Sequence, residues 1–239
     1  LLSALDCAYW DLFGKLENKS FSGINQLENK TLAESSITIS IAEIDEQIRK
    51  IENSSWNKFK VKCNGFNLEN TEKLLNLNRN IALDANASFT KEDCLFIQET
   101  SGFQKLMYIE QPLEIGNFGI LKNGNSVNWM ADEDCQDITF LEKLKPYYSS
   151  INIKLMKCGG LTPALEMITE AKKLGYKIML GCMTESSIGI SAGCAIAGLL
   201  DFADLDGANL ISNDYATGSF VDNGKIILSE KPGLGIALL

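Results

Sequence analysis

The chain has 239 residues, a net charge of -9 and no histidine. This length fits one large domain, and the acidic charge, without any Lys or Arg cluster, argues against nucleic acid or an anionic membrane surface as a partner. The lack of His excludes Ser-His-Asp and Cys-His nucleophiles and His-liganded zinc. Acid-base chemistry must therefore use Lys, Asp, Glu, Cys or Tyr, and a metal ion is the expected helper.

Cysteine usage indicates the redox compartment. The chain has seven Cys, an odd number, and no C-x-x-C pair. This pattern is typical of reduced thiols, so we expect a cytoplasmic protein rather than a disulfide scaffold. No run of about 18 apolar residues offers a membrane span.

The first 20 residues predict a helix that packs against the rest of the chain. Apolar residues recur at helical spacing on one face, and Gly14 lies inside the pattern. We expect this helix to pack rather than to catalyse. The face consists of Ala4, Leu5, Ala8, Leu12 and Leu16.

From residue 37 onward, short β-branched or apolar runs alternate with longer amphipathic ones, which predicts a parallel α/β barrel of the (β/α)8 type. The predicted strands are 37–41, 59–62, 81–84, 107–110, 128–132, 151–154, 177–180 and 202–205, and the predicted helices include 44–51, 68–77, 91–99, 138–144 and 163–174. Thr162 is predicted as the N-cap of the last of these helices, before Pro163. Asn223-Gly224 predicts a hairpin after the eighth strand.

Charged residues end five consecutive predicted strands. They are spaced 22, 26, 22 and 22 residues apart, one strand-helix unit each time. Since the carboxyl ends of barrel strands meet at one face, where active sites of this architecture lie, the spacing predicts a ring of charged groups. The ring is Lys62, Asp84, Glu110, Asp132 and Lys154.

The three acids of this ring come from neighbouring strands, so their carboxylates could converge on one hard cation. Oxygen ligands of this kind favour Mg2+. Asp132 also begins the acidic run 132–134, and such a run is often only solvated. Several acids at a barrel mouth repel one another unless a cation or lysines compensate.

Lysines flank the acids on both sides. Lys60 and Lys62 point to the same side of one strand, into the barrel, because strand side chains alternate. Their mutual repulsion and a divalent cation are expected to lower a lysine pKa enough to make a base. Lys154 enters across the ring from Lys62, whereas Lys157 is expected on the surface or in a loop. Two opposed lysines and a metal predict removal and return of an α-proton through an enediolate, with inversion at carbon.

In this order, the residues resemble the enolase superfamily and, within it, the muconate-lactonizing subgroup. Each motif alone is weak, but the ordered set spans almost the whole chain. The matching motifs are Ala4-Leu5-Asp6-x-Ala8-x-Trp10-Asp11-Leu12-x-Gly14-Lys15, Lys60-x-Lys62, Asp84-Ala85-Asn86, Glu110-Gln111-Pro112, Asp132-Glu133, Asn152-Ile153-Lys154-Leu155-x-Lys157-x-Gly159-Gly160 and Pro232-Gly233-Leu234-Gly235.

The resemblance implies a modified (β/α)7β barrel, with Mg2+ on Asp84, Glu110 and Asp132 and with Lys62 and Lys154 as the acid-base pair. It also implies that residues 1–239 form one catalytic barrel domain and that the family's N-terminal capping domain is absent from this chain. The lack of His separates the chain from the mandelate-racemase-like branch, which uses a His base.

The substrate class depends on the end of the eighth strand. Asp204-Leu205-Asp206 resembles the Asp-x-Asp of dipeptide epimerases, in which two acids hold the substrate's α-ammonium group, and period-two spacing aims both carboxylates at one cation. The other interpretation is a pair of turn acids that only closes the strand. The same resemblance implies substrate contacts from Thr38, Lys60 and Cys182. The expected function is thus a Mg2+-dependent epimerase that inverts the α-carbon of a dipeptide's C-terminal residue.

Two alternatives stay open. The first is another reaction of the subgroup, namely that of o-succinylbenzoate synthase, muconate cycloisomerase or N-acylamino acid racemase, whose substrates lack a free ammonium group. The second is a metal-binding barrel without catalysis. The sequence does not decide the preferred dipeptide side chains or whether the protein forms a homo-oligomer.

Overall fold

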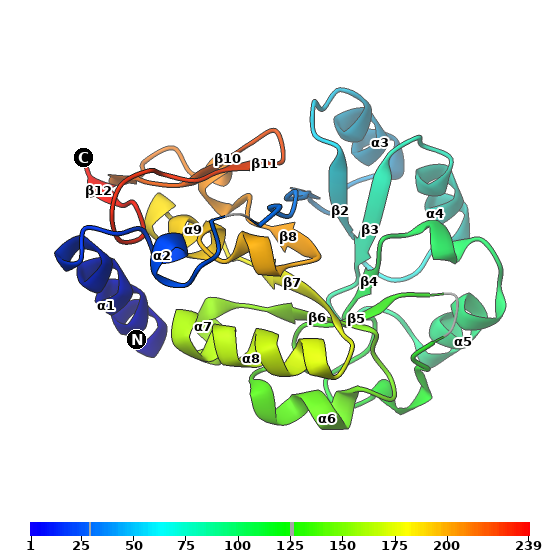
Figure 1. Ribbon diagram of the computed structural model, residues 1–239. Helices are drawn as coiled ribbons and strands as arrows, with labels where there is room; N and C mark the ends of the chain where they lie inside the picture. Colours follow the sequence, from blue (N-terminus) through cyan, green and yellow to red (C-terminus); the bar gives the residue numbers. More distant parts are fainter. Residues whose placement is uncertain (29, 125–126) are drawn as a thin grey trace.

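The computed structural model describes residues 1–28, 30–124 and 127–239. Eight parallel strands form one sheet in chain order, each paired with the next, and the sheet curves into a nearly closed barrel (Figure 1). The α/β barrel expected from the sequence is confirmed. The strands are β1 (Ile37–Ile39), β2 (Lys58–Lys62), β3 (Asn80–Asp84), β4 (Ile109–Glu110), β5 (Trp129–Ala131), β6 (Ser150–Ile153), β7 (Lys177–Gly181) and β8 (Phe202–Asp204).

The barrel closes through a seam rather than a full ladder. Between β8 and the start of β1 there is one bridge, Ser35 to Ala203. The amide of Ser36 donates to the Ala203 carbonyl at 2.8 Å, and the amide of Leu205 donates to the Ser35 hydroxyl at 2.9 Å. Serine hydroxyls therefore supply part of the hydrogen bonding that a strand ladder supplies elsewhere.

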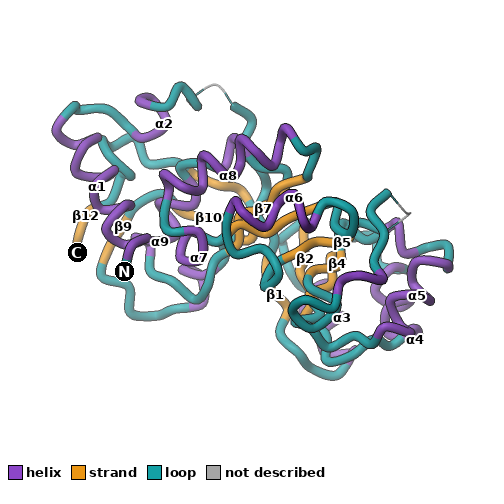
Figure 2. The backbone as a smooth tube through the Cα atoms, turned by 90° about the horizontal axis from the view of Figure 1, so that it is seen from below, coloured by secondary structure: helices purple, strands orange, loops and turns teal. Residues whose placement is uncertain are grey.

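Helices lie outside the strands, and Figure 2 shows them around the barrel from a second direction. The helices are α1 (Leu2–Leu16), α2 (Phe21–Ile24), α3 (Ile44–Glu52), α4 (Leu68–Leu75), α5 (Lys91–Glu99), α6 (Leu141–Leu144), α7 (Leu155–Cys158), α8 (Leu161–Lys173) and α9 (Ser187–Cys194). Short 3-10 helices are η1 (Phe103–Lys105), η2 (Phe118–Ile120), η3 (Ile138–Phe140), η4 (Ala197–Leu199) and η5 (Gly207–Leu210).

The core has two parts. A large cluster fills the space between the strands and the helices. A small cluster plugs the barrel interior, with Ala82, Tyr108, Met130 and Met179 buried in it. Because side chains alternate along a strand, the next inward position after each of Ala82, Tyr108 and Met130 comes two residues later, towards the carboxyl end. Those positions are the three acids Asp84, Glu110 and Asp132.

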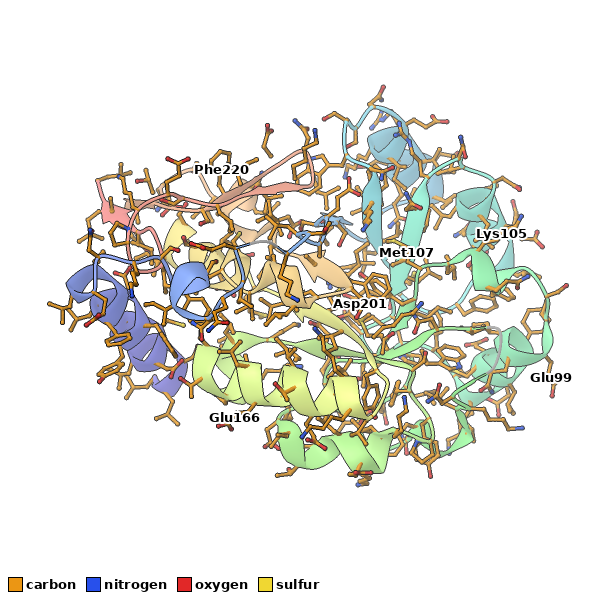
Figure 3. All side chains as sticks on the ribbon, in the orientation of Figure 1. Glu99, Lys105, Met107, Glu166, Asp201 and Phe220 are labelled. Atoms are coloured by element: carbon orange, nitrogen blue, oxygen red, sulfur yellow. The ribbon has the colours of Figure 1, made fainter. Side chains whose placement is uncertain are left out.

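Figure 3 labels side chains at both depths of the molecule. Met107 and Asp201 come just before β4 and β8, and they lie near the centre of the view at the amino ends of these strands. Glu99 and Glu166 lie at the periphery, on α5 and α8. These charged side chains of the outer helices thus lie outside the apolar cluster of the barrel interior.

The helix expected at 163–174 begins earlier than predicted. Its N-cap is Gly160, so Thr162 is not the cap. The Asp6 carboxylate accepts a hydrogen bond from the Thr162 amide at 3.0 Å, and the Thr162 hydroxyl accepts one from the Trp10 indole at 2.9 Å. Pro163 is tolerated because amides of the first helical turn have no partner within the helix.

The packing face predicted for the first helix is wrong. Ala4, Leu5, Ala8, Leu12 and Leu16 are all exposed, and Gly14 is the buried residue of α1. The opposite side packs against the protein because polar groups anchor it there. The Asp6 carboxylate binds the start of α8, and the Asp11 carboxylate accepts the Leu234 amide at 2.9 Å.

The tail forms the predicted hairpin, β10 (Phe220–Asp222) and β11 (Lys225–Ile227), with positive φ at Asn223 and Gly224. A second pair joins β9 (Ala216–Thr217) to β12 (Ala237–Leu238). No helix among residues 1–28, 30–124 and 127–239 is long and apolar enough to cross a membrane.

Candidate active site

The carboxyl ends of the strands enclose a cavity of about 290 Å³. Eight of the ten site residues predicted from the sequence line its wall, namely Thr38, Lys60, Lys62, Asp84, Lys154, Cys182, Asp204 and Asp206. The other two, Glu110 and Asp132, are buried and lie within 4 Å of lysines of this wall. The structure therefore brings all ten together at one face of the barrel.

Strand register places the charged side chains next to one another. Lys62 on β2 pairs with Asp84 on β3, and Asp84 pairs in turn with Glu110 on β4. Since paired residues on neighbouring strands point to the same face, the three side chains share the barrel interior. The 22- and 26-residue spacings in the sequence correspond to this register.

Lys60 lies at the centre of the acids. Its ammonium nitrogen is 2.5 Å from Asp204, 3.5 Å from Glu110 and 3.6 Å from Asp84, and only 6% of its side chain is exposed. Burial alone would lower the pKa of Lys60, but Asp204, Glu110 and Asp84 together raise it well above its usual value. Lys60 is a fixed cation here and not the base that lysine repulsion was expected to create.

The two predicted acid-base lysines each contact a carboxylate. Lys62 donates to Asp84 at 2.9 Å and to the Asn86 amide oxygen at 2.7 Å, with 33% of its side chain exposed. Lys154 donates to Asp132 at 2.7 Å. Burial lowers the pKa of Lys154, but Asp132 more than offsets this and the net shift is upward. The expected fall in lysine pKa is therefore not found at Lys154.

Lys157 was predicted on the surface or in a loop, but the structure places it elsewhere. Its side chain is 14% exposed, and its nitrogen lies 2.5 Å from Asp132 Oδ1 and 2.7 Å from the Asp132 carbonyl. The short helix α7 turns the chain so that Lys157 reaches back beneath Asp132. Burial raises the pKa of Asp132, but Lys157 and Lys154 outweigh it, so the pKa lies below its ordinary value.

Asp204 and Asp206 have different surroundings. Asp204 has both oxygens occupied, one by Lys60 and the other by the Ser36 hydroxyl at 3.1 Å. Asp206 accepts the Thr38 amide at 2.7 Å through Oδ2, whereas the one hydrogen-bond partner of Oδ1 among the described residues is the Cys182 sulfur at 4.0 Å. Burial and the charge of Asp204 raise the pKa of Asp206 to about 6. Of these two carboxylates, Asp206 is therefore the one with an oxygen that can accept from a ligand.

The cysteine thiol beside Asp206 is not activated. Burial and the charges of Asp204 and Asp206 raise the pKa of Cys182, so the thiol stays protonated near neutral pH. Burial likewise raises the pKa of Cys63 to about 12. Neither thiol is therefore a candidate nucleophile, and of the two only Cys182 lines the cavity.

The three predicted metal ligands offer the carboxylate oxygens that a hard cation prefers, although their partners in this structure are lysines. No group of three or more His, Cys, Asp and Glu side chains in the described part of the chain lies in metal-binding geometry. One oxygen of Glu110, Oε2, is buried without a hydrogen-bond partner among the described residues, and the Lys60 ammonium lies 3.5 Å from it. Burial raises the pKa of Glu110 to about 8, against the effect of Lys60. A divalent cation bound to this oxygen would give it a partner and would lower the pKa of Glu110.

Some polar side chains of the quoted motifs were given no role in the sequence analysis, although they hold the predicted site residues. Asn152 donates to Glu110 at 2.7 Å, and it lies against Gly181, where any larger residue would meet the Asn152 amide. Asn86 binds Lys62, and Glu133 accepts from Asn86 at 3.4 Å. Strand alternation could have found Asn152, because it precedes Lys154 by two positions. Nothing in the pattern marks the contact between Asn86 and Glu133.

Residues 43–239 match the family described as enolase C-terminal domain-like. The chain belongs to this enolase-like family. The match covers the barrel from the start of α3 to the C-terminal residue, so the ring of charged strand ends lies wholly within it. The expected enolase-superfamily barrel is confirmed.

Relatives of this enolase-like barrel include epimerases. The chain is 35% identical to the L-Ala-D/L-amino acid epimerase of a Maribacter species over 99% of this chain and 72% of that protein. It is 28% identical to a Methylococcus capsulatus dipeptide epimerase, solved with Mg and L-Arg-D-Lys, with a TM-score of 0.85 over 98% of this chain and 72% of that one. An Enterococcus faecalis dipeptide epimerase, solved with Mg and L-Leu-L-Tyr, is 27% identical with a TM-score of 0.83, over 99% and 72% of the chains.

Proposed function

We propose that this chain is a Mg2+-dependent dipeptide epimerase, an isomerase that inverts the α-carbon of the C-terminal residue. One observation carries the proposal: Lys62, Lys154 and the part-free carboxylate of Asp206 line the same cavity. Two proton carriers and an ammonium-binding acid in one cavity match the needs of this reaction. The relatives that are dipeptide epimerases support the same assignment.

Asp206 would hold the substrate's α-ammonium group. Its Oδ1 is free to accept, while Thr38 fixes the other oxygen. We assign Asp204 an indirect part, because its own oxygens are bound by Lys60 and Ser36. Thr38 and Cys182 line the wall beside Asp206 and would contact the N-terminal residue.

Asp84, Glu110 and Asp132 would hold Mg2+, which when bound supplies positive charge next to the substrate carboxylate and so makes the α-proton more acidic. Lys62 and Lys154 do the proton transfer. One of these two lysines, in its neutral form, removes the α-proton, and the electron pair of the broken C–H bond moves into the substrate carboxylate. The protonated lysine then returns a proton to the opposite face, and the configuration is inverted. Lys60 stays charged and stabilises the acids around it.

The place of action that we propose is the cytoplasm, with a dipeptide as the small-molecule partner. All seven cysteines lie as free thiols, which supports a reducing compartment.

The test is proton NMR with Mg2+ in D2O and a set of L,L dipeptides. We expect the α-proton signal of the C-terminal residue to disappear while a diastereomer appears. Turnover of an N-acylamino acid, a muconate or a succinylbenzoate precursor, without any dipeptide exchange, would instead support one of the other reactions of the subgroup. Mg2+ binding without any exchange would support a barrel that binds metal without catalysis.

Lysine variants test the two-base step. Lys62→Ala and Lys154→Ala should each abolish epimerisation, a loss of at least about 100-fold for a general acid or base. Lys177→Ala is the matched control, because Lys177 is exposed at the amino end of β7, away from the cavity. If either active-site variant still epimerised at the rate of the control, the paired-lysine mechanism would be wrong.

A further inference from the structure

Asp134 is a buried carboxylate that the proposed reaction does not use. It is 3% exposed and lies two residues beyond Asp132. Its three hydrogen-bond donors are all uncharged: the Gly116 amide at 2.8 Å on Oδ1, and Gln111 Nε2 at 2.9 Å and the Tyr148 hydroxyl at 2.8 Å on Oδ2. A buried carboxyl group is costly unless it is hydrogen-bonded, so these three bonds hold their donors in place.

Gln111 links Asp134 to the strand ends. It is fully buried, and its φ of +37° is unusual for a residue other than glycine. Its Nε2 donates to Asp134 and to the Leu113 carbonyl at 2.8 Å. Its Oε1 accepts the amides of Asp132 and Asp134, both at 3.1 Å. The side-chain amide of Gln111 thus donates two hydrogen bonds and accepts two, which is its full capacity.

These bonds fix which way the Gln111 amide points. If the amide were flipped, its NH2 group would face the two backbone amides and its oxygen would face two acceptors. Only a carboxylate at position 134 accepts from Gln111, Tyr148 and Gly116 together. The donors and acceptors of this network are thus ordered in one direction only.

The network joins the backbones of two candidate metal ligands. Gln111 directly follows Glu110, and the amide that its side chain binds is that of Asp132. The Gln111 carbonyl also accepts the amide of Ala87 at 2.8 Å, in the loop that follows Asp84. Ala87 has a φ of +64°, so strained backbone lies at two of the three strand ends.

We propose that Asp134 is a positioning residue: through Gln111 it holds the backbones of Glu110 and Asp132 at the spacing needed for the cation. The inference rests on the proposed Mg2+ site. Asp134 itself touches neither the cavity nor a substrate. It acts by restricting how far the carboxyl ends of β4 and β5 can move apart.

The test is Mg2+ titration of the metal-free protein by calorimetry, which needs no substrate. In Asp134→Asn, an NH2 group replaces one acceptor and faces the NH2 of Gln111 or the amide of Gly116. We expect the Kd for Mg2+ to rise by about tenfold or more, the size typical of lost outer-shell partners. Asp137→Asn is the matched control, since it removes the same charge three residues later and should bind like the wild type.

A second variant restores the ordering. In Gln111→Glu combined with Asp134→Asn, the carboxylate moves to position 111, where it accepts both backbone amides and the NH2 group of the new asparagine. Net charge is the same as in the wild type, the bond to the Leu113 carbonyl is lost, and the Tyr148 hydroxyl accepts from the asparagine NH2 group instead of donating to position 134. We expect this pair to bind Mg2+ more tightly than Asp134→Asn alone. A purely structural role would lower the melting temperature without changing the Kd of the folded protein.

The outcomes separate the two proposals. Failure of the wild type to bind Mg2+ would refute the metal site itself. Wild-type binding together with an unchanged Kd in Asp134→Asn would refute the positioning role. If Asp134→Asn does not fold, Tyr148→Phe decides, because it removes one donor to Asp134 and leaves the packing. Unchanged Mg2+ affinity in Tyr148→Phe, or weakened affinity in the exchanged pair although it folds, would then overturn the inference.

Discussion

Four lysines share the carboxylates of the site, and each has a different environment. Lys60 is buried among three acids, and Lys157 is held by Asp132 and backbone carbonyls, so both are fixed. Lys62 and Lys154 each bind one carboxylate and reach the cavity. The number of oxygens that each lysine binds therefore separates the lysines that hold the site together from those that can exchange a proton.

Asp206 makes the free energy of unfolding depend on pH. Its pKa is about 6 in the folded protein, above the ordinary value of about 4. Below pH about 4 it is protonated in both states and has no effect. Between about 4 and 6 the unfolded state loses the proton first, so stability falls as pH rises, and above that the penalty is constant.

Asp206→Asn should therefore stabilise the protein above pH 7 by on the order of 1–2 kcal/mol, and should not do so near pH 4. It should also slow dipeptide turnover, because the ammonium-binding charge is lost. Urea unfolding at the two pH values measures the first effect, with Asp222→Asn on the exposed hairpin as control. Equal stabilisation at both pH values would show that burial does not shift this carboxyl group.

At the scale of residues, the sequence predicted which side chains gather but not what they bind. Spacing located Lys62, Asp84, Glu110, Asp132 and Lys154, since strand repeats set their register. It could not show that carboxylates raise the pKa values of Lys60 and Lys154 in spite of burial, because those shifts depend on distances. Lys157 was misplaced for a related reason, since its direction depends on the single turn of α7.

Among the elements, α1 shows how close approach can decide packing. Gly14 lies against the Gly233 backbone, and a Cβ on Gly14 would come within 2.5 Å of the Gly233 Cα and 2.8 Å of the Lys19 carbonyl. The helix is thus seated by a backbone contact and by the carboxylates of Asp6 and Asp11. Its exposed leucines have no part in this seating.

Gly14→Ala should destabilise the protein although alanine is the better helix former. The propensity gain is about 1 kcal/mol, whereas overpacking against backbone on two sides costs about 1–3 kcal/mol or more. We expect a net loss of about 1–2 kcal/mol, which is a fall of about 2–8 °C in melting temperature for a chain of this size. Gly119→Ala is the control, because a Cβ added to Gly119 would have no atom of a described residue within 4 Å apart from its two chain neighbours.

A melting temperature of Gly14→Ala at or above that of Gly119→Ala would mean that the Gly14 contact can relax at no cost.

The strands and most helices were predictable because their apolar periodicities are long and regular, and α5 has the predicted bounds. The face of α1 was not, because its pattern is apolar almost all round. There the choice of face depends on polar partners from α8 and the C-terminal segment, far away in the sequence.

Across the whole molecule, the acids of the barrel mouth link metal binding to stability. Asp84, Glu110 and Asp132 are buried, and at Glu110 the charge of Lys60 offsets the cost of burial only in part. A cation bound to the folded state alone would stabilise it. At a concentration 100-fold above its Kd the gain is about 2.7 kcal/mol.

Adding Mg2+ should therefore raise the melting temperature by about 5–10 °C, and EDTA should reverse the shift. Glu110→Gln should reduce the shift strongly while leaving the fold intact, because it keeps the shape of the side chain and removes its charge. Glu114→Gln, four residues later and exposed, should respond like the wild type. A full Mg2+ response in Glu110→Gln would remove Glu110 from the ligand set. Differential scanning calorimetry makes the comparison directly.

The seam between β8 and β1 gives the barrel a direction of opening. Elsewhere a strand must break its ladder with a neighbour, but here one bridge and the hydroxyls of Ser35 and Ser36 hold the two edges. Amide hydrogens along this line should exchange with solvent sooner than those of β2, β3, β6 and β7. Asp204 and Asp206 follow the same edge, so the proposed ammonium-binding site lies where the barrel can open most easily. The three acids Asp84, Glu110 and Asp132 instead lie on, or directly after, strands that are hydrogen-bonded to neighbours on both sides.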